Sequence, residues 1–238
     1  MISFIVPAYN EERLLGATLD ALHAAGLAVG EGYELIVVDD ASTDRTALIA
    51  QDHGARLVSV AHRQIAATRN AGAREARGEW FIFVDADTRV DETVVRAAVQ
   101  AMRDGAVGGG AAVQFDGVVP LYARLLMPVV IRLFHATRMA AGCFLFCTRS
   151  AFAAAGGFDE AFYGAEELAM SWALGRQGRF VVLRQKVVTS GRKLRTHSPR
   201  EMLSIMARLA LRGPKAVKQR QGMELWYGER REDPHKDD

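Results

Sequence analysis

Two aspartates separated by one residue, Asp85 and Asp87, are the side chains in this sequence best suited to chemistry. They follow the apolar run 80–84, which predicts a buried β-strand that ends at the pair. Alternate residues of a strand point to the same side, so both carboxylates are expected to face one site. Two hard oxygen ligands suit Mg²⁺ or Mn²⁺ held together with substrate phosphates. The alternative is that the acids only end the strand and cap the next helix, although Asp91 already stands in the capping position.

The first hundred residues alternate between short apolar runs and segments with helical spacing. The pattern predicts strands at 2–6, 35–39, 56–60 and 80–84, and helices at 10–26, 42–50, 64–77 and 91–103. Asn10 is expected to cap the first helix, and Ser42 or Thr43 the second. This alternation indicates right-handed βαβ units and a mostly parallel sheet covered by helices on both faces. In such a sheet, ligands bind beyond the carboxyl ends of the strands, where Asp85 and Asp87 fall.

The second half of the chain is less regular. Strands are expected at 111–115, 144–147, 180–183 and 187–189, and helices at 166–174 and 198–211. An apolar stretch at 118–134 is too short and too charged to span a bilayer. It is suited to a membrane surface, to the core or to a dimer interface. The last dozen residues are polar and expected to fray. Without a visible repeat or linker, we expect a single domain over 1–238.

Length and composition match those of a soluble globular protein. The chain has 238 residues, of which 50% are hydrophobic and 24% charged. These values exclude extended disorder, a collagen-like repeat and a polytopic membrane protein. The two cysteines, Cys143 and Cys147, lie in an apolar run and are expected to be buried and reduced. Because no signal peptide is visible at the start, a cytoplasmic protein is expected.

The formal net charge of +2 hides an uneven distribution. Residues 176–220 carry thirteen Lys or Arg against a single acid, Glu201. Such a stretch can neutralise phosphates, a membrane surface or nucleic acid, or it can be a solvated surface. No nucleic-acid recognition motif accompanies it, so nucleic acid is not expected as a partner.

The aspartate pair belongs to a series of short motifs. In chain order these are FIVPAYNEE at 4–12, IVVDDASTDRT at 36–46, AATRNAGAREARGE at 66–79, FVDADT at 83–88 and GCFLFCTRSAFAAAGGFDEAFYGAEE at 142–167. In this order they resemble glycosyltransferase family 2, and the resemblance covers about residues 2–190. It implies a GT-A fold, an α/β architecture with a Rossmann-like, mostly parallel sheet flanked by helices, followed here by a C-terminal helical extension. It also implies an inverting enzyme that moves a sugar from a nucleotide diphosphate sugar to a hydroxyl acceptor.

The resemblance divides the domain into a nucleotide-sugar-binding half at 1–104, an acceptor-binding half at 105–190 and a basic helical extension at 191–238. The implied nucleotide contacts are Pro7, Tyr9, Glu11, Asp39, Asp40, Arg69, Asn70, Asp85 and Arg192. A carboxylate at Asp39 or Asp40 can accept the N3–H of uracil or the N1–H and amine of guanine, which favours a UDP- or GDP-sugar. The other reading of these two acids is a turn with local hydrogen bonds and a helix cap.

The resemblance also implies the reacting groups. Asp87 would ligate Mn²⁺ or Mg²⁺, with Asp85 at the ribose or the water shell of the metal, and His197 is a candidate third protein ligand. Glu166 and Glu167 match the acidic pair of the family, whose second member is the general base. The family usually has Asp there, and Glu167 reaches one methylene further. The alternative for both glutamates is a favourable place at a helix N-terminus.

The segment TSGRKLRTH at 189–197 is suited to closing over the donor, with Arg192, Lys193 and Arg195 as a clamp on the diphosphate. The apolar residues of 118–134 and 198–211 suggest a lipid or lipid-linked acceptor, with peripheral attachment to the inner face of a membrane. A homodimer interface is the alternative for these apolar surfaces.

Two other functions remain open from the residues alone. One is a non-catalytic nucleotide-binding scaffold of the same fold, which the change at Glu167 leaves open. The other is a nucleotidyltransferase on a related sheet. Such enzymes usually open with a Gly-rich loop followed by Arg and Lys, and the first loop here, PAYNEE, has neither basic residue.

Overall fold

The structure is a computed structural model that describes residues 1–125, 132, 137, 139–198, 200–202, 204, 217–221, 223 and 227–228. The strands are β1 (Ile2–Ala8), β2 (Tyr33–Asp40), β3 (Arg56–Val60), β4 (Trp80–Val84), β5 (Thr88–Arg89), β6 (Gly108–Phe115), β7 (Phe144–Thr148) and β8 (Phe180–Thr189). The helices are α1 (Leu15–Val29), α2 (Thr46–Asp52), α3 (Ile65–Glu75), α4 (Glu92–Arg103), α6 (Arg149–Ala155), α7 (Glu166–Gly175) and α8 (Arg192–Thr196).

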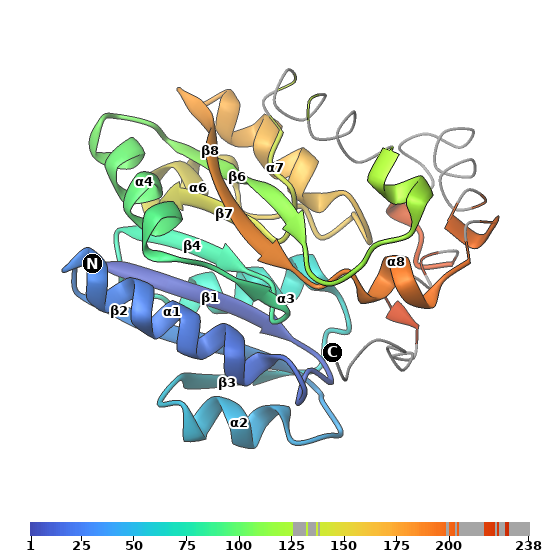
Figure 1. Cartoon of the computed structure of the whole chain (residues 1–238). Coiled ribbons are helices and arrows are strands. Elements are labelled where there is room, and N and C mark those ends of the chain that lie inside the picture. Colours follow the sequence, from blue (N-terminus) through green and yellow to red (C-terminus); the bar gives the residue numbers. More distant parts are fainter. Residues whose placement is uncertain are drawn as a thin grey trace.

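All eight strands form one curled sheet in the order β3-β2-β1-β4-β7-β6-β8-β5 (Figure 1). Four of the seven pairings are parallel, and β7 runs antiparallel to both of its neighbours, β4 and β6. The two strands predicted at 180–183 and 187–189 are one strand, β8. An irregularity in its pairing with β6 places Leu183 and Lys186 opposite the successive residues Ala111 and Ala112, which explains the break in the apolar pattern.

Each face of the sheet carries its own hydrophobic core, because side chains alternate along the strands. In β1, Phe4 and Val6 point to the layer formed by α1, α2 and α4, whereas Ile5 points to the layer of α3, α6 and α7 (Figure 1). α3 lies especially close to the sheet. A Cβ at Gly72 would stand 2.4 Å from Cγ2 of Ile5 and 2.7 Å from Cγ2 of Val38. The glycine of the Arg-Asn-x-Gly motif therefore permits this contact.

The first predicted cap is wrong. α1 begins at Leu15, so Asn10 does not cap it. Asn10 adopts a φ of 50°, its Oδ1 accepts a hydrogen bond from the amide of Thr43 (2.8 Å), and its own amide donates to Oγ of Ser42 (2.9 Å). The side chain is used to join two loops instead of starting a helix.

The second predicted cap is also wrong, and the third is confirmed. α2 begins at Thr46, whose amide donates to the carboxylate of Asp44 (2.9 Å), so neither Ser42 nor Thr43 caps it. Asp91 caps α4 as predicted, because its Oδ1 accepts a hydrogen bond of 3.0 Å from the amide of Val94.

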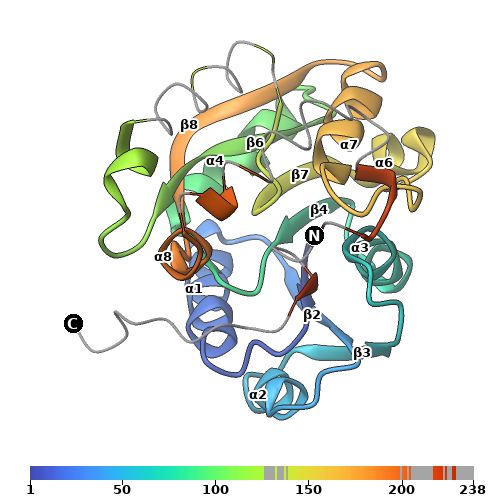
Figure 2. The same cartoon turned by 90° about the vertical axis from the view of Figure 1, so that its right-hand side faces the viewer.

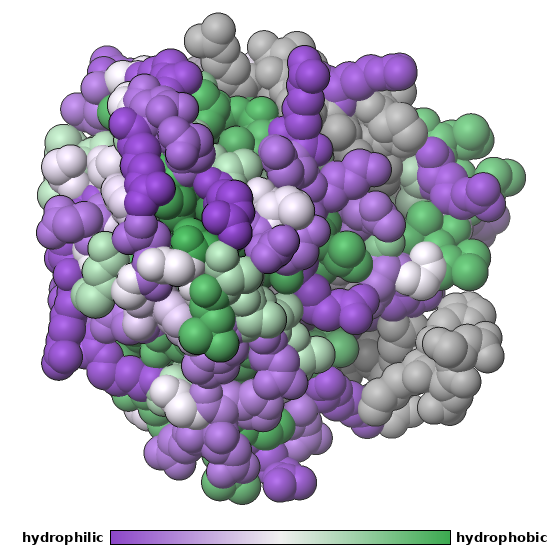
Figure 3. Space-filling model, turned by 60° about the vertical axis from the view of Figure 1, so that its left-hand side comes forward, coloured by the Kyte–Doolittle hydropathy of each residue, from purple (hydrophilic) through white to green (hydrophobic). Residues whose placement is uncertain are grey.

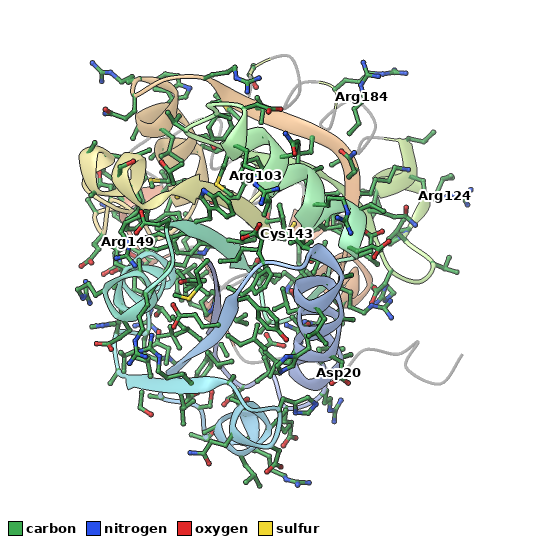
Figure 4. All side chains as sticks on the ribbon, turned by 90° about the vertical axis from the view of Figure 1, so that its left-hand side faces the viewer. Asp20, Arg103, Arg124, Cys143, Arg149 and Arg184 are labelled. Atoms are coloured by element: carbon green, nitrogen blue, oxygen red, sulfur yellow. The ribbon has the colours of Figure 1, made fainter. Side chains whose placement is uncertain are left out.

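Much of the apolar stretch 118–134 and of the predicted helix 198–211 lies outside the described residues, although 121–125 is helical. Among the residues that are described, none of the helices is long and apolar enough to cross a membrane. Cys143 and Cys147 are free and buried, as predicted, and Figure 4 shows Cys143 inside the molecule.

Candidate active site

A pocket lies at the carboxyl ends of β1, β2 and β4, the edge that faces the viewer in Figure 2. Its lining consists of Pro7, Ala8, Tyr9, Glu11, Asp40, Arg63, Gln64, Ile65, Thr68, Asp85, Ala86, Asp87, Arg192, Lys193 and Tyr227. Most of these residues follow strand ends, as the sequence predicts for a ligand site in such a sheet. The side of the molecule away from this edge bears mainly hydrophilic side chains, with hydrophobic ones in between (Figure 3).

Two loops that bring residues to the pocket are fastened to each other. The amide of Glu11 donates to Oγ1 of Thr46 (2.8 Å), and the amide of Glu12 donates to Oδ2 of Asp44 (3.1 Å). Together with the bonds of Asn10, these contacts fix the loop after β1 against the loop after β2. The side chain of Glu11 is thereby held in the pocket.

Several non-glycine residues near the carboxyl ends of the strands have a strained backbone conformation with positive φ. Within the described part of the chain, the non-glycine residues with positive φ are Asn10, Ala41, Arg63 and Ala165, at 50° to 60°. The first three follow β1, β2 and β3, and the fourth precedes α7. Such conformations cost roughly 1–3 kcal/mol each and concentrate at functional sites.

The aspartates at the end of β2 differ in their surroundings. Asp40 lines the pocket, and its carboxylate accepts hydrogen bonds from the amides of Arg63 (2.8 Å) and Gln64 (3.1 Å) and from Oγ1 of Thr68 (2.9 Å). Asp39 accepts a bond of 3.3 Å from the amide of Ser42. Asp39 therefore has a local turn contact of the kind that the sequence offers as the alternative to base recognition, whereas Asp40 is bound by residues at and just before the start of α3.

An arginine covers the aromatic residue of the first loop. The guanidinium carbon of Arg63 lies 3.5 Å from the centre of the Tyr9 ring. Both residues line the pocket. A cation on a ring at this distance is attracted by the π-electrons, so the pair forms a flat, positively charged wall.

The loop that carries Asp85 and Asp87 is fixed by its backbone. The amide of Asp85 donates to the carbonyl of Cys143 (3.2 Å), the carbonyl of Ala86 accepts from Oγ1 of Thr18 (2.9 Å), and the carbonyl of Asp87 accepts from the amide of Ser190 (3.1 Å). Both carboxylates line the pocket, as the sequence predicts.

A basic residue from the end of the sheet enters the pocket. Nη2 of Arg192 donates to Oδ2 of Asp87 (3.1 Å) and to Oε1 of Glu11. Lys193 also lines the pocket. Arg195, predicted as part of the same clamp, is instead held by Asp116, whose carbonyl and carboxylate oxygens accept its hydrogen bonds at 2.7 and 3.1 Å.

Arg69 joins the aspartate pair to the acidic pair. It is 2% exposed and donates hydrogen bonds of 2.8 Å each to Oδ1 of Asp85, Oε1 of Glu166 and the carbonyl of Gly142. Burial opposes its charge, but the carboxylates of Asp85, Glu166 and Glu167 outweigh burial and raise the pKa of Arg69 above its ordinary value. The arginine is thus a permanent buried cation between two acids.

The acidic pair occupies the first turn of α7. Glu166 is buried and paired with Arg69. Burial and the neighbouring charge of Glu166 raise the pKa of Glu167 to about 8, against the opposing effect of Arg69. The two glutamates therefore differ, because one is held in an ion pair while the other is poised to exchange a proton near neutral pH.

Six predicted site residues do not line the pocket, namely Asp39, Arg69, Asn70, Glu166, Glu167 and His197. The amide group of Asn70 donates to the carbonyl of Phe158 and to Glu160, and accepts from the amide of Phe158, each at 2.9 Å. It does not line the pocket but secures the turn before α7. Nδ1 of His197 lies 3.0 Å from the carbonyl of Lys193, and the structure does not bring His197 together with Asp85 and Asp87.

The arginine of the 142–167 motif, Arg149, also lies away from the pocket. It donates to the carbonyls of Ala76 (2.6 Å) and Gly78 (2.9 Å), where α3 ends. Figure 4, which looks from the side opposite the pocket, shows it at that end of the sheet.

The carboxylates of the pocket supply part of the ligands that a divalent cation needs. Within the described residues, no three His, Cys, Asp or Glu side chains form a group that could hold a metal ion. Asp85 and Asp87 both line the pocket and offer a pair of hard oxygen ligands from one loop. Mg²⁺ and Mn²⁺ are commonly held by one or two carboxylates together with substrate phosphates, and this pair matches that arrangement.

Some lining residues were not predicted. Arg63 and Gln64 directly precede α3, and Ile65 and Thr68 lie in its first turn. Their only sequence signal is the expected beginning of a helix at 64. Tyr227 comes from the last dozen residues, which the sequence marks only as polar.

The family model "Glycosyl transferase family 2" matches residues 3–159. The undecaprenyl-phosphate 4-deoxy-4-formamido-L-arabinose transferase of Pseudomonas aeruginosa strain LESB58 is 35% identical over 37% of this chain and 28% of its own length. The succinoglycan biosynthesis protein ExoO of Rhizobium meliloti strain 1021 is 36% identical over 52% of this chain and 36% of its own length. The chain thus spans little more than a third of these relatives at most.

Solved structures share the fold. The mannosyltransferase PcManGT of Pyrobaculum calidifontis, in complex with GDP-Man and Mn²⁺, has a TM-score of 0.69 at 21% identity, covering 92% of this chain and 64% of its own. The glucosyl-3-phosphoglycerate synthase of Mycobacterium tuberculosis, with Mn²⁺, UDP and glucosyl-3-phosphoglycerate, has a TM-score of 0.60 at 21% identity, covering 97% and 81%. At these identities the likeness establishes the GT-A fold alone, which confirms the predicted architecture.

Proposed function

Because the chain belongs to glycosyltransferase family 2, we propose that it transfers a sugar from a UDP- or GDP-sugar to a hydroxyl group, with inversion at the anomeric carbon. The observation that carries this proposal is the connection of the pocket to the acidic pair. Asp85 in the pocket and Glu166 at the start of α7 share one buried cation, Arg69. A donor bound at Asp85 would therefore lie next to a carboxyl group that can act as a base.

The basic residues of the pocket suit the diphosphate of the donor. Arg192 and Lys193 can donate charge-assisted hydrogen bonds to phosphate oxygens. Tyr9, with Arg63 on its ring, offers a flat wall for the nucleoside. Support comes from the fold neighbours, one described in complex with GDP-Man and Mn²⁺ and another with UDP-GlcNAc.

Glu167 is our candidate for the general base. Its carboxylate takes the proton of the acceptor hydroxyl while the oxygen attacks the anomeric carbon from the face opposite the diphosphate. The bond from that carbon to the diphosphate breaks, and its electron pair leaves with the nucleoside diphosphate. Burial of Glu167 and the neighbouring charge of Glu166 raise the pKa of Glu167 and so favour its taking a proton.

Asp85 and Asp87 are our candidates for holding Mn²⁺ or Mg²⁺. When bound, such an ion neutralises charge on the departing diphosphate. The protein's own part is to hold two carboxylates on one rigid loop. Of the candidate ligands, His197 is the weakest, because its ring lies against the carbonyl of Lys193.

For the acceptor, we propose a lipid or lipid-linked hydroxyl compound. Val118, Leu121 and Leu125 are 75%, 69% and 67% exposed, in a segment that Arg195 joins to α8 through Asp116. Exposed apolar residues near basic ones suit an anionic membrane surface. A relative named for transfer involving undecaprenyl phosphate gives further support.

Calorimetry with UDP and GDP, with and without Mn²⁺, tests the donor site. We expect one nucleotide to bind in a metal-dependent manner, and Asp87→Ala to abolish this binding. Asp20→Ala is the matched control, because Asp20 lies on α1 with a side chain 73% exposed (Figure 4). If neither nucleotide binds under any metal condition, the transferase proposal fails.

The base is tested with the nucleotide sugar that calorimetry selects. Glu167→Gln should keep nucleotide affinity and slow release of the nucleoside diphosphate by about 10²- to 10⁴-fold. An unchanged rate would remove Glu167 from this role.

Flotation with vesicles of phosphatidylcholine and phosphatidylglycerol tests the membrane surface. We expect the protein to float with these vesicles at low salt, and the double variant Leu121→Ser, Leu125→Ser to stay behind. Leu27→Ser is the control, since Leu27 is 72% exposed on α1. Equal flotation of all three proteins would contradict a role for this surface.

A further inference from the structure

We propose that Tyr227 is a donor-binding residue whose ring forms one wall of the pocket and contacts the nucleoside diphosphate. This inference rests on the proposed transferase function and adds a residue outside the region 3–159 that the family model matches. Tyr227 lines the same pocket as Tyr9, Asp85 and Asp87.

The position of Tyr227 is fixed by the start of α3. Its hydroxyl oxygen lies 3.4 Å from the amide nitrogen of Ile65, which donates the hydrogen bond. Burial raises the pKa of Tyr227 to about 12, so its hydroxyl stays protonated and neutral at physiological pH. α3 is also the helix that carries Arg69. The tyrosine is therefore tied to the element that connects the pocket with the acidic pair.

The chain near Tyr227 is docked on the loop before α7. The amide of Tyr163 donates to the carbonyl of Val217 (2.7 Å), and the rings of Tyr163 and Tyr227 meet edge to face with centres 6.0 Å apart. Met223 is 1% exposed, and its sulfur would lie 3.3 Å from a Cβ at Gly164. A side chain anchored at several points presents a preorganised surface, which lowers the entropic cost of ligand binding.

The pocket thus has two aromatic residues, each near an arginine. Arg63 lies 3.5 Å from the centre of the Tyr9 ring, and Arg220 lies 5.5 Å from that of Tyr227. Rings suit the flat base of a nucleotide, and the guanidinium groups suit its phosphates. A nucleoside diphosphate carries both features in one molecule.

The test compares the Mn²⁺-dependent affinities of UDP and GDP for the wild-type chain and its variants by calorimetry. Tyr227→Ala should weaken binding by about 5- to 150-fold, the range that loss of one aromatic stacking contact gives. Tyr227→Phe keeps the ring and should stay within about threefold of wild type. Trp172→Ala is the control, because Trp172 is 68% exposed and does not line this pocket.

Circular dichroism and thermal melting establish that each variant folds. If Tyr227→Ala does not fold, Tyr227→Leu keeps bulk without an aromatic face and should show the same loss of affinity. If a folded Tyr227→Ala or Tyr227→Leu variant binds nucleotide as tightly as wild type or more tightly, the inference about Tyr227 is wrong. The donor site itself would still stand, because the wild-type protein binds nucleotide in that case. Absence of binding to the wild-type chain would bring down both proposals.

Discussion

The guanidinium of Arg192 lies 3.1 Å from Oδ2 of Asp87, so the carboxylate that is our candidate metal ligand is paired with a cation of the protein itself. The same guanidinium also contacts Glu11. A divalent cation would compete with Arg192 for Asp87. A donor diphosphate, in turn, would offer Arg192 new acceptors, so that metal and donor together can replace the ion pair.

Arg192→Met should therefore change two affinities in opposite directions. Nucleoside diphosphate should bind about ten- to hundred-fold more weakly, because charge-assisted hydrogen bonds of roughly 1.5–3 kcal/mol are lost. Mn²⁺ alone should bind more tightly, because its competitor for Asp87 is gone. Calorimetric titrations measure both. Arg124→Met, at an exposed position labelled in Figure 4, removes the same charge and should change neither. Parallel changes in both affinities would contradict the competition.

The pH dependence of stability reports on Glu167. Folding raises its pKa from 4.5 to about 8, so the native state binds this proton more tightly than the unfolded chain. The stability that this provides is complete below pH 4.5 and is lost as pH rises to about 8. The free energy of unfolding of Glu167→Gln should therefore rise relative to that of wild type between pH 4.5 and about 8. Above that pH the difference should stay constant. Urea unfolding at several pH values measures the difference, and a difference independent of pH would show that the carboxyl group is not perturbed.

Removal of the buried cation should destabilise the fold. Arg69→Met leaves Glu166, itself 4% exposed, without its partner, at a cost of about 3–5 kcal/mol. The double variant Arg69→Met, Glu166→Gln should recover part of this loss, because the uncompensated charge is gone. Urea unfolding of the single and double variants gives the coupling between the two residues. Additive losses would mean that the ion pair contributes nothing of its own.

The contact between α3 and the sheet should tolerate no side chain at Gly72. Gly72→Ala places a methyl group 2.4 Å from Ile5, and overpacking of this kind costs about 1–3 kcal/mol. Gly175→Ala is a matched control, because a Cβ there meets nothing within 4 Å and should be neutral or slightly stabilising. Thermal melting compares the two variants. Equal melting temperatures would show that the helix can move away from the sheet at little cost.

Most elements of the first hundred residues could be predicted because they carry a local signal, such as the apolar run of β4 or the cap at Asp91. The two-residue strand β5 was not predicted, because it is defined by its pairing with β8. Asp85 and Asp87 were found for the same reason, since they directly follow a strand. Asn10 was misread because its side chain serves a contact with Thr43, more than thirty residues away, and that contact has no local signal.

Long-range partners also explain three of the differences at the site. Asn70 fits the motif, but the helix face that carries it packs against Phe158 and Glu160. Arg195 sits beside Arg192 in a basic run, yet Asp116 holds it. Tyr227 has neither periodicity nor a motif around it, so only the folded chain reveals its place in the pocket.

The direction of β7 bears on how the protein can adapt to its ligands. Because β7 runs against β4, it begins at the edge of the sheet where β4 ends, with Phe144 opposite Val84. The backbone hydrogen bonds between β4 and β7 join the first and second halves of the chain in one sheet. The protein is therefore one stiff body and not two lobes that close by a hinge. Molecules of different size must be accommodated by the loops along that edge. Lengthening such a loop would alter which molecules fit while the strands beneath it keep their register.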